Sequence, residues 1–156
     1  MRLDDALSEF LASPVMIIIG THDEALRPEI GRGSGALVHA ETDTVEVLLS
    51  SWLWPGTARN LRTNGAFAAT FARPRDYAAY QVKGRATVIE PQAEHRRIAA
   101  DYTEAIRETL MAQGLVARLI DPWLSERELV VACVSVAEVY EQTPGPRAGR
   151  ALPASP

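Results

Sequence analysis

The sequence predicts a mainly β fold, in which about six antiparallel strands form a sheet or barrel with helices on the outside. Extended segments follow one another through short turns, whereas a parallel α/β protein alternates its strands with helices. These segments also carry the alternating or continuous β-branched apolar runs that are typical of strands. The 156 residues are enough to bury a core without disulfide or metal support.

The first third of the chain is expected to contain one helix and three extended segments. Apolar residues recur at helical spacing over residues 3–11, which predicts a short amphipathic helix. The β-branched run 15–19 predicts a strand that is buried on both faces. Extended structure resumes over 27–39 and again over 44–50.

The middle of the chain predicts a second short helix and two more strands. The helix is expected over residues 57–64, with Thr57 as its cap and Gly65 as its left-handed terminator. Apolar side chains then alternate over 67–71 and over 80–88, as they do in strands with one buried face.

The last third of the chain predicts one long helix and one long strand. Apolar residues recur at four-residue intervals within 92–113, and Gly114 ends this helix. The valine-rich run 129–140 predicts the sixth strand. We therefore expect a single domain over 1–142, followed by a Pro/Gly-rich tail, 143–156, that ends in disorder.

Composition excludes several classes of function. The formal charge of −4, from 16 basic and 20 acidic residues, argues against a nucleic-acid partner. No apolar run approaches the roughly 18 residues that span a bilayer, so no membrane partner is expected. The single cysteine, Cys133, excludes a disulfide framework and a Cys-rich zinc site. A cytoplasmic protein is expected, because the early acids Asp4 and Asp5 do not suit a secretory leader.

The three histidines predict no metal site, because none of them lies three or four positions from another. His22 is best interpreted as part of a solvated turn, and His95 as part of a solvated helix face. His39 lies at a polar strand end, and it is the histidine that a haem would use as an axial ligand.

Residues 31–36 fit the spacing G-x-G-x-x-A of a dinucleotide-binding loop. That loop requires a helix directly after it, and the residues that follow here are extended. A glycine-rich strand that another backbone or molecule approaches closely is the better interpretation.

Residues 50–61 carry a more informative pattern. Ser50 and Ser51 leave a strand, and a helix then begins near Thr57 with Arg59 in its first turn. The free N–H groups of a helix N-terminus attract a phosphate, and Arg59 would add a bidentate charged partner. A capped helix with a surface arginine is the alternative, and both interpretations stay open.

Lys83 is the only lysine among 16 basic residues, which suggests that a compact charge is needed at its position. Gln81 lies on the same strand and points away from Tyr80 and Val82. Its amide offers a donor and an acceptor to the edge of a heterocycle. An outward-facing strand residue is the alternative for Lys83.

The order of these segments resembles the pyridoxamine 5′-phosphate oxidase-like, FMN-binding split β-barrel superfamily from about residue 15 to 147. The matching pieces are the strand at Arg32, the strand end Ser50-Ser51, and the helix with the Ala/Phe-rich strand after it. Tyr80-Gln81-Val82-Lys83-Gly84 is similar to the Gln-Val-basic-x-Gly strand of that family. Thr143-Pro144-Gly145-Pro146 resembles the tail of a flavoprotein-like subgroup.

The resemblance implies a six-stranded split barrel of the FMN-binding type, with Arg32 reaching the flavin phosphate. Ser50 and Ser51 would line the isoalloxazine, and Gln81 would touch the ring. The family's Ser-Arg-Lys phosphate triplet falls at Pro55-Gly56-Thr57, so that only Thr57 is suited to phosphate and Arg59 would substitute for the rest. The cofactor-binding residues expected on this basis are Arg32, Gly33, Ser34, Ser50, Ser51, Thr57, Arg59, Gln81 and Lys83.

The resulting hypothesis is a flavin-dependent oxidoreductase with FMN between two subunits and a small-molecule substrate that the sequence does not identify. No catalytic residue is identified. The C-terminal Trp and Arg-x-His features of the true oxidase do not occur after Tyr140, so vitamin B6 oxidation is not expected. The alternative is a flavin- or haem-binding module without turnover, for storage or sensing. A deazaflavin would use the same cleft as FMN.

A homodimer is expected because a split barrel leaves strand edges that need to be covered. The aromatic residues Trp52, Trp54 and Tyr80 near the expected site are suited to the core of such an interface.

Overall fold

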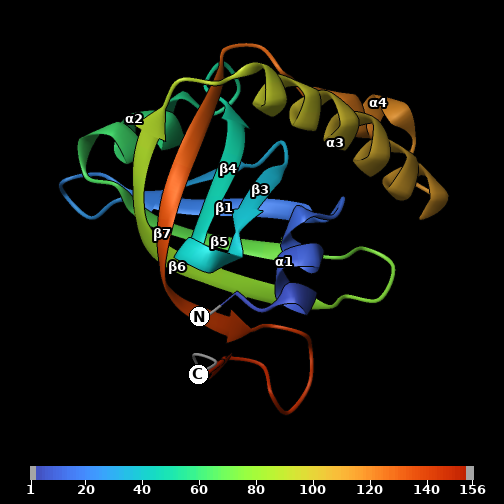
Figure 1. Cartoon of the computed structure of the whole chain (residues 1–156). Helices are drawn as coiled ribbons and strands as arrows, with labels where there is room; N and C mark the ends of the chain where they lie inside the picture. Colours follow the sequence, from blue (N-terminus) through green and yellow to red (C-terminus); the bar gives the residue numbers. More distant parts are fainter. Residues whose placement is uncertain (1–2, 154–156) are drawn as a thin grey trace.

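The two ends of the sheet, β2 and β3, are formed by one continuous segment of the chain. In the computed structural model, which describes residues 3–153, the strands pair antiparallel in the order β2-β1-β5-β6-β7-β4-β3, with β8 beside β7 (Figure 1). The strands are β1 (Met16–His22), β2 (Pro28–Arg32), β3 (Ala36–His39), β4 (Thr44–Ser50), β5 (Ala66–Ala72), β6 (Ala79–Ile89), β7 (Leu129–Glu141) and β8 (Arg150–Ala151). The helices are α1 (Asp5–Ala12), α2 (Pro55–Thr63), α3 (Ala93–Ala112) and α4 (Ala117–Ile120), with single 3-10 turns at Ala40–Thr42 and Asp121–Trp123.

The stretch 28–39 closes the barrel because it pairs with both ends of the sheet. Its first part, β2, pairs with β1, and its second part, β3, pairs with β4. Between them, the N–H of Gly33 donates to the carbonyl of Ile17 across 2.9 Å, and the N–H of Ser34 donates to Leu48 across 2.6 Å. The chain thus crosses from one edge of the sheet to the other without a break in hydrogen bonding.

Glycine is required at position 33 because a Cβ there would lie 2.7 Å from Cγ2 of Ile17. The stretch 31–36 therefore allows two backbones to approach closely, and it continues as strand β3 instead of a helix. The dinucleotide-loop interpretation does not apply.

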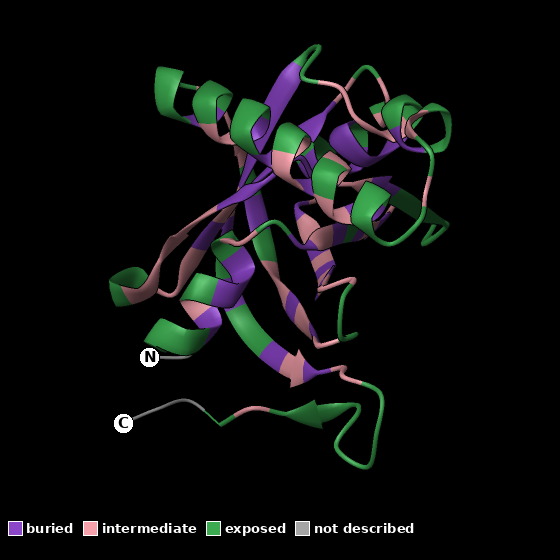
Figure 2. Cartoon of the chain, turned by 90° about the vertical axis from the view of Figure 1, so that its right-hand side faces the viewer, coloured by how far each residue is buried: buried purple, intermediate pink, exposed green. Residues whose placement is uncertain are grey.

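Alternate residues of the strands fill the interior of the barrel. Val47, Phe71, Val82 and Val134 are almost completely buried, one on each of β4, β5, β6 and β7. Figure 2 shows the buried strands inside the molecule and the exposed outer sides of the helices. The period of two along each strand is the reason that the sequence pattern predicts most of the core. The expectation that residues 15–19 are buried on both faces is wrong, because Ile18 points outward and is 36% exposed.

The helices cover different parts of the barrel (Figure 1). α1 packs against β3, and α2 packs against β1 and β2. α3 covers the outer face of β4 and β7, where Ala99 and Ile98 contact Leu48 and Val131 in a second small apolar cluster. None of the described helices is long and apolar enough to cross a membrane.

The predicted fold class is confirmed, but the strand count differs. The structure has eight strands because Gly33 to Gly35 divide the predicted segment 27–39 into β2 and β3, and because the tail forms β8. The terminators Gly65 and Gly114 have positive φ of 66° and 91°, as expected. The expected disorder at the end of the tail falls on residues 154–156, outside the described residues.

The predicted helix cap is wrong. α2 begins at Pro55 with Trp54 as its N-cap residue, so Thr57 is the third residue of the helix and lies within its first turn. Proline is favoured at the first helical position because its fixed φ suits the helix and its missing N–H is not needed there.

Candidate functional site

The outer face of β1, β5 and β6 carries a flat group of small and polar side chains, which we call the outer shelf: Gly20, Ala68, Thr70, Gln81 and Lys83. The register places Ala68 between Gly20 and Lys83, and Thr70 opposite Gln81. These residues are half-buried, whereas their strand neighbours Ala69 and Val82 point into the core. The shelf is thus a shallow floor with an amide and an ammonium group at its border.

Gln81 and Lys83 are held loosely on this face. The Nε2 of Gln81 lies 3.4 Å from the Oγ1 of Thr70, and the Nζ of Lys83 lies 4.8 Å from the centre of the Tyr140 ring. The hydroxyl of Tyr140 donates to Glu138 across 2.7 Å, and this bond raises the pKa of Tyr140. Both Gln81 and Lys83 therefore keep donors that are free for a ligand.

Positive charge continues along the outer face of β6. Arg85 lies two residues beyond Lys83 on the same face and is exposed, and its Nη2 donates to the carbonyl of Asn64 across 2.7 Å. A cavity of about 390 Å³ lies beside Arg85, and Arg62 also lines it.

The two serines at the end of β4 hold a loop. The hydroxyl of Ser50 donates to the carbonyl of Arg127 across 2.6 Å, and that of Ser51 donates to the carbonyl of Glu128 across 3.0 Å. Ser50 is buried and Ser51 is half-buried. These bonds fix the chain between α4 and β7, and they are the local role that the structure gives to the serine pair.

Residues of β2 pack against the N-terminus of α2. Thr57 is fully buried, and its hydroxyl has no hydrogen-bond partner among the described residues. A Cβ added to Gly31 would lie 2.6 Å from the Oγ1 of Thr57, so β2 packs directly on this side chain. A Cβ on Gly56 would lie 2.7 Å from the Cδ of Glu29, so an acidic side chain occupies the space in front of the first turn. Arg59 is exposed.

Arg32 points away from this helix. Since Gly31 faces Thr57, the next residue of the strand faces the opposite side. The Arg32 guanidinium lies 4.5 Å from the ring centre of Trp123, in a cation–π contact. Gly33 and Ser34 are buried where the barrel closes. The structure thus does not bring Arg32 together with Thr57, although both were expected at the phosphate.

A histidine–carboxylate pair was missed by sequence reasoning. The Nε2 of His95 lies 2.9 Å from the Oε2 of Glu46, and its Nδ1 accepts from the N–H of Gln92 across 2.9 Å. His95 is buried, so its interpretation as a solvated residue is wrong. Gln92 and His95 form a reciprocal capping box, but Gln-x-x-His does not fit the Ser/Thr-x-x-Glu/Gln signature of that motif, so no such signal was present in the sequence.

His39 approaches the same carboxylate, with its Nε2 3.5 Å from the Oε2 of Glu46. Among residues 3–153, however, no three His, Cys, Asp or Glu side chains are grouped in a way that would hold a metal ion.

No protein-family model and no curated protein matches the sequence. Several solved structures match the fold. A putative pyridoxamine 5′-phosphate oxidase from Lactobacillus delbrueckii has a TM-score of 0.55 at 14% identity, over 89% of this chain and 93% of that chain. An F420 reductase has a TM-score of 0.54 at 11% identity, over 85% and 94% of the two chains. HutZ of Vibrio cholerae, described as a haem storage protein, has a TM-score of 0.53 at 15% identity, over 90% and 95%.

This chain has the pyridoxamine 5′-phosphate oxidase-like split-barrel fold.

In this split barrel, the ring and the phosphate of an FMN molecule would meet different surroundings. The outer shelf offers a planar ring a floor of small side chains and two border donors, Gln81 and Lys83. The N-terminus of α2 does not suit a phosphate, because Glu29 is packed against it and the Thr57 hydroxyl is inaccessible. The residues of the outer shelf thus suit a planar ring, whereas those at the start of α2 do not suit a phosphate.

Proposed function

We propose that this split-barrel protein is a flavin-dependent oxidoreductase that binds FMN on the outer shelf, between two copies of the chain. The observation that carries the proposal is the half-buried floor formed by Gly20, Ala68 and Thr70, with the amide of Gln81 and the ammonium of Lys83 at its border. The substrate is a small molecule, and the location is the cytoplasm, which suits a chain with a single cysteine.

Each border residue has a separate task in this proposal. The Gln81 amide pairs with the polar edge of the ring system, since it supplies a donor and an acceptor together. Lys83 supplies a point charge that attracts the negatively charged phosphate. The bound flavin would supply the hydride and electron chemistry, and the chain would bind and orient it.

The phosphate is assigned to the positive end of β6, where Lys83 and Arg85 follow one another on one face. Guanidinium groups suit phosphate because their N–H groups bind two oxygens at once. Arg59, exposed on α2, is the remaining candidate from the sequence.

A second copy of the chain is proposed as the cover of the shelf. Ile18 and Ile30 lie on the same outer face as the shelf and are 36% and 63% exposed. Exposed branched aliphatic side chains beside a polar floor favour burial in an isologous dimer. Of the aromatic residues that the sequence suggested, Trp54 packs against the core and Tyr80 packs on Phe10. Trp52 is 50% exposed, and the Arg127 guanidinium lies over its ring.

Titration of FMN and riboflavin into the purified protein, followed by flavin fluorescence, tests the cofactor site. Lys83→Gln is expected to weaken FMN binding about tenfold or more and to affect riboflavin, which lacks the phosphate, much less. Arg118→Gln, which replaces an exposed arginine on α4, is the matched control and should not change the affinity for either ligand. A dimer that does not bind FMN would overturn the flavin proposal.

The same titration locates the phosphate. A larger loss for Arg59→Ala than for Lys83→Gln would place the phosphate near α2 instead of beside the shelf. A larger loss for Arg32→Ala would place it at the β2 edge of the outer face, where Arg32 pairs with Ile18. Anaerobic bleaching of the bound flavin by a reduced nicotinamide then tests the oxidoreductase activity, since a passive binder keeps its colour. Light scattering tests the dimer, and a stable monomer of 17.0 kDa at micromolar concentration contradicts it.

Haem binding is the second candidate, and the half-buried His39 is the observation that favours it. Its imidazole lies at the end of β3, and among residues 3–153 only the 3.5 Å contact with Glu46 competes for its Nε2. A Soret band that His39→Ala abolishes would support this candidate. A deazaflavin is distinguished from FMN by mass spectrometry of the released chromophore.

A further inference from the structure

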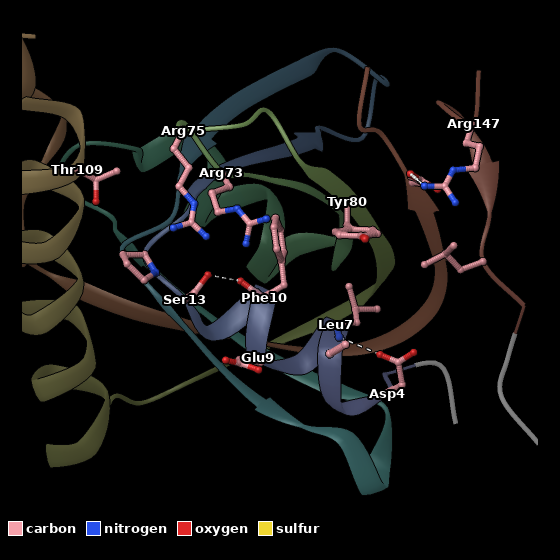
Figure 3. A pocket seen from close by; sticks show the side chains of 14 residues that line it. Asp4, Leu7, Glu9, Phe10, Ser13, Arg73, Arg75, Tyr80, Thr109 and Arg147 are labelled. Carbon is pink, nitrogen blue, oxygen red and sulfur yellow. Dashed lines mark hydrogen bonds and ion pairs between the residues drawn. The ribbon is translucent and has the colours of Figure 1, made fainter. Parts of the chain in front are cut away.

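A cavity of about 780 Å³ opens on the core side of the barrel, between α1, the β5–β6 turn and the chain after β7 (Figure 3). Its volume is in the range of small-molecule sites, and barrel mouths are common places for them. The cavity is distinct from the outer shelf, because Tyr80 pairs with the buried Phe71 and so faces inward, while Gln81 faces outward. Nothing in the proposed flavin site uses it.

One wall of the cavity is aromatic. The rings of Phe10 and Tyr80 meet edge to face, with their centres 5.0 Å apart and their planes at 80°. Leu7 and Leu152 add aliphatic surface to the same lining. The hydroxyl of Tyr80 has no hydrogen-bond partner among the described residues, so this apolar wall carries one free polar group.

Two arginines extend over one end of this wall (Figure 3). Arg73 is fixed there by Asp76, which receives bonds from its Nε at 3.0 Å and its Nη2 at 2.8 Å. The Arg73 guanidinium lies 5.1 Å from the ring centre of Phe10. Arg75 is exposed, and its charge helps to lower the pKa of the neighbouring Asp76. It makes no hydrogen bond or close ion pair with any residue of the described part of the chain, so its five N–H groups are available.

The other end of the cavity is acidic. Glu141 lines it with 8% exposure, and its carboxylate is 3.1 Å from the Nη2 of Arg147. Asp4 also lines this end, as Figure 3 shows. A ligand with one negative group would therefore place that group at Arg75, away from Glu141, and its apolar body along Phe10 and Tyr80.

We propose that this cavity is a second binding site, which takes a small organic anion with a ring-shaped or chain-like apolar body. Arg75 binds the carboxylate, sulfonate or phosphate group, and the Phe10–Tyr80 wall binds the body. Arg73 is committed to Asp76, so it contributes to the positive potential and to the packing more than to direct bonding.

The test uses two fluorescent probes with the same arene body. One is 8-anilinonaphthalene-1-sulfonate, and the other is N-phenyl-1-naphthylamine, which lacks the sulfonate. The folded protein is expected to bind the sulfonate, and Arg75→Gln should weaken that binding about tenfold. Arg75 is exposed, so its replacement leaves the fold intact, and thermal melting verifies this.

Two control variants make the result specific. Arg118→Gln and Arg96→Gln, changes of other exposed arginines on α4 and α3, should leave binding of the sulfonate unchanged. Equal binding of the sulfonate by Arg75→Gln and the parent protein would overturn the proposal, and so would equal affinity for the uncharged probe. Failure of FMN to bind would not affect this result, because the two sites share no residue.

Discussion

The hydroxyl of Tyr102 on α3 donates a hydrogen bond to the carbonyl of Val15, 2.8 Å away in the interior. This bond attaches the long helix to the residue just before β1. Removal of the hydroxyl would leave a buried carbonyl unpaired. We expect Tyr102→Phe to lower the free energy of unfolding by about 1–3 kcal/mol, as measured by chemical denaturation at neutral pH.

The same tyrosine gives a prediction on alkaline pH. Burial raises the pKa of Tyr102 above its ordinary value, so the folded state favours the protonated form. The unfolded chain ionises near its ordinary pKa of about 10, and stability is therefore complete below that pH and falls above it, by at most about 1.4 kcal/mol per pH unit. The free energy of unfolding of Tyr102→Phe should fall less steeply above this pH than that of the parent protein. Parallel stability curves would contradict the prediction.

A substitution at Thr57 is expected to stabilise the protein. Its hydroxyl is buried inside the packing of α2 on β2, without a partner among the described residues. Thr57→Val replaces this oxygen with a methyl group of similar size. We expect it to raise the free energy of unfolding by about 1 kcal/mol, because an unpaired buried hydroxyl is costly. Thr57→Ser, which keeps the oxygen, is the control, and a destabilised valine variant would show that the hydroxyl has a partner.

The sequence predicted the fold because strand and helix periodicities are local properties. The runs from residue 15 to residue 141 appear in the structure as alternating buried positions, and α3 spans nearly the predicted residues. The division of 27–39 into two strands was not predictable in this way. It depends on Ile17 and Leu48, which are far away in the sequence and receive the bonds of Gly33 and Ser34.

The candidate site was harder to predict, because a side chain's direction depends on strand register. A shift by one position separates Gly31, which packs on α2, from Arg32, which packs on Trp123. The approach of Glu29 to Gly56 is likewise a contact between distant segments. Gln81 and Lys83 were identified from a local motif, and the alternation along β6 does place both on one face.

The His95–Glu46 pair gives a further stability prediction. His95→Leu would remove the acceptor for the Gln92 N–H and would leave Glu46 without its partner at 2.9 Å. We expect a loss of about 2 kcal/mol, with the start of α3 frayed in hydrogen exchange. Arg96→Leu, on the exposed side of the same turn, is the control and should cost less than about 0.5 kcal/mol. Equal losses for the two variants would contradict this role of His95.

Cys133 gives a prediction about reactivity. Burial raises the pKa of its thiol, and the negative charge of Glu46 raises it further. Since only the thiolate is nucleophilic, the reaction with a disulfide reagent near pH 8 should be slow in the folded protein. Glu46→Gln removes one of the two causes, and we expect it to accelerate the reaction about two- to threefold. As a control, the two proteins are unfolded in about 6 M guanidinium, where the parent and variant rates should be equal because the folded-state contacts are lost. Equal rates in the folded state would show that the Glu46 charge does not reach the thiol, and burial alone would then account for its raised pKa.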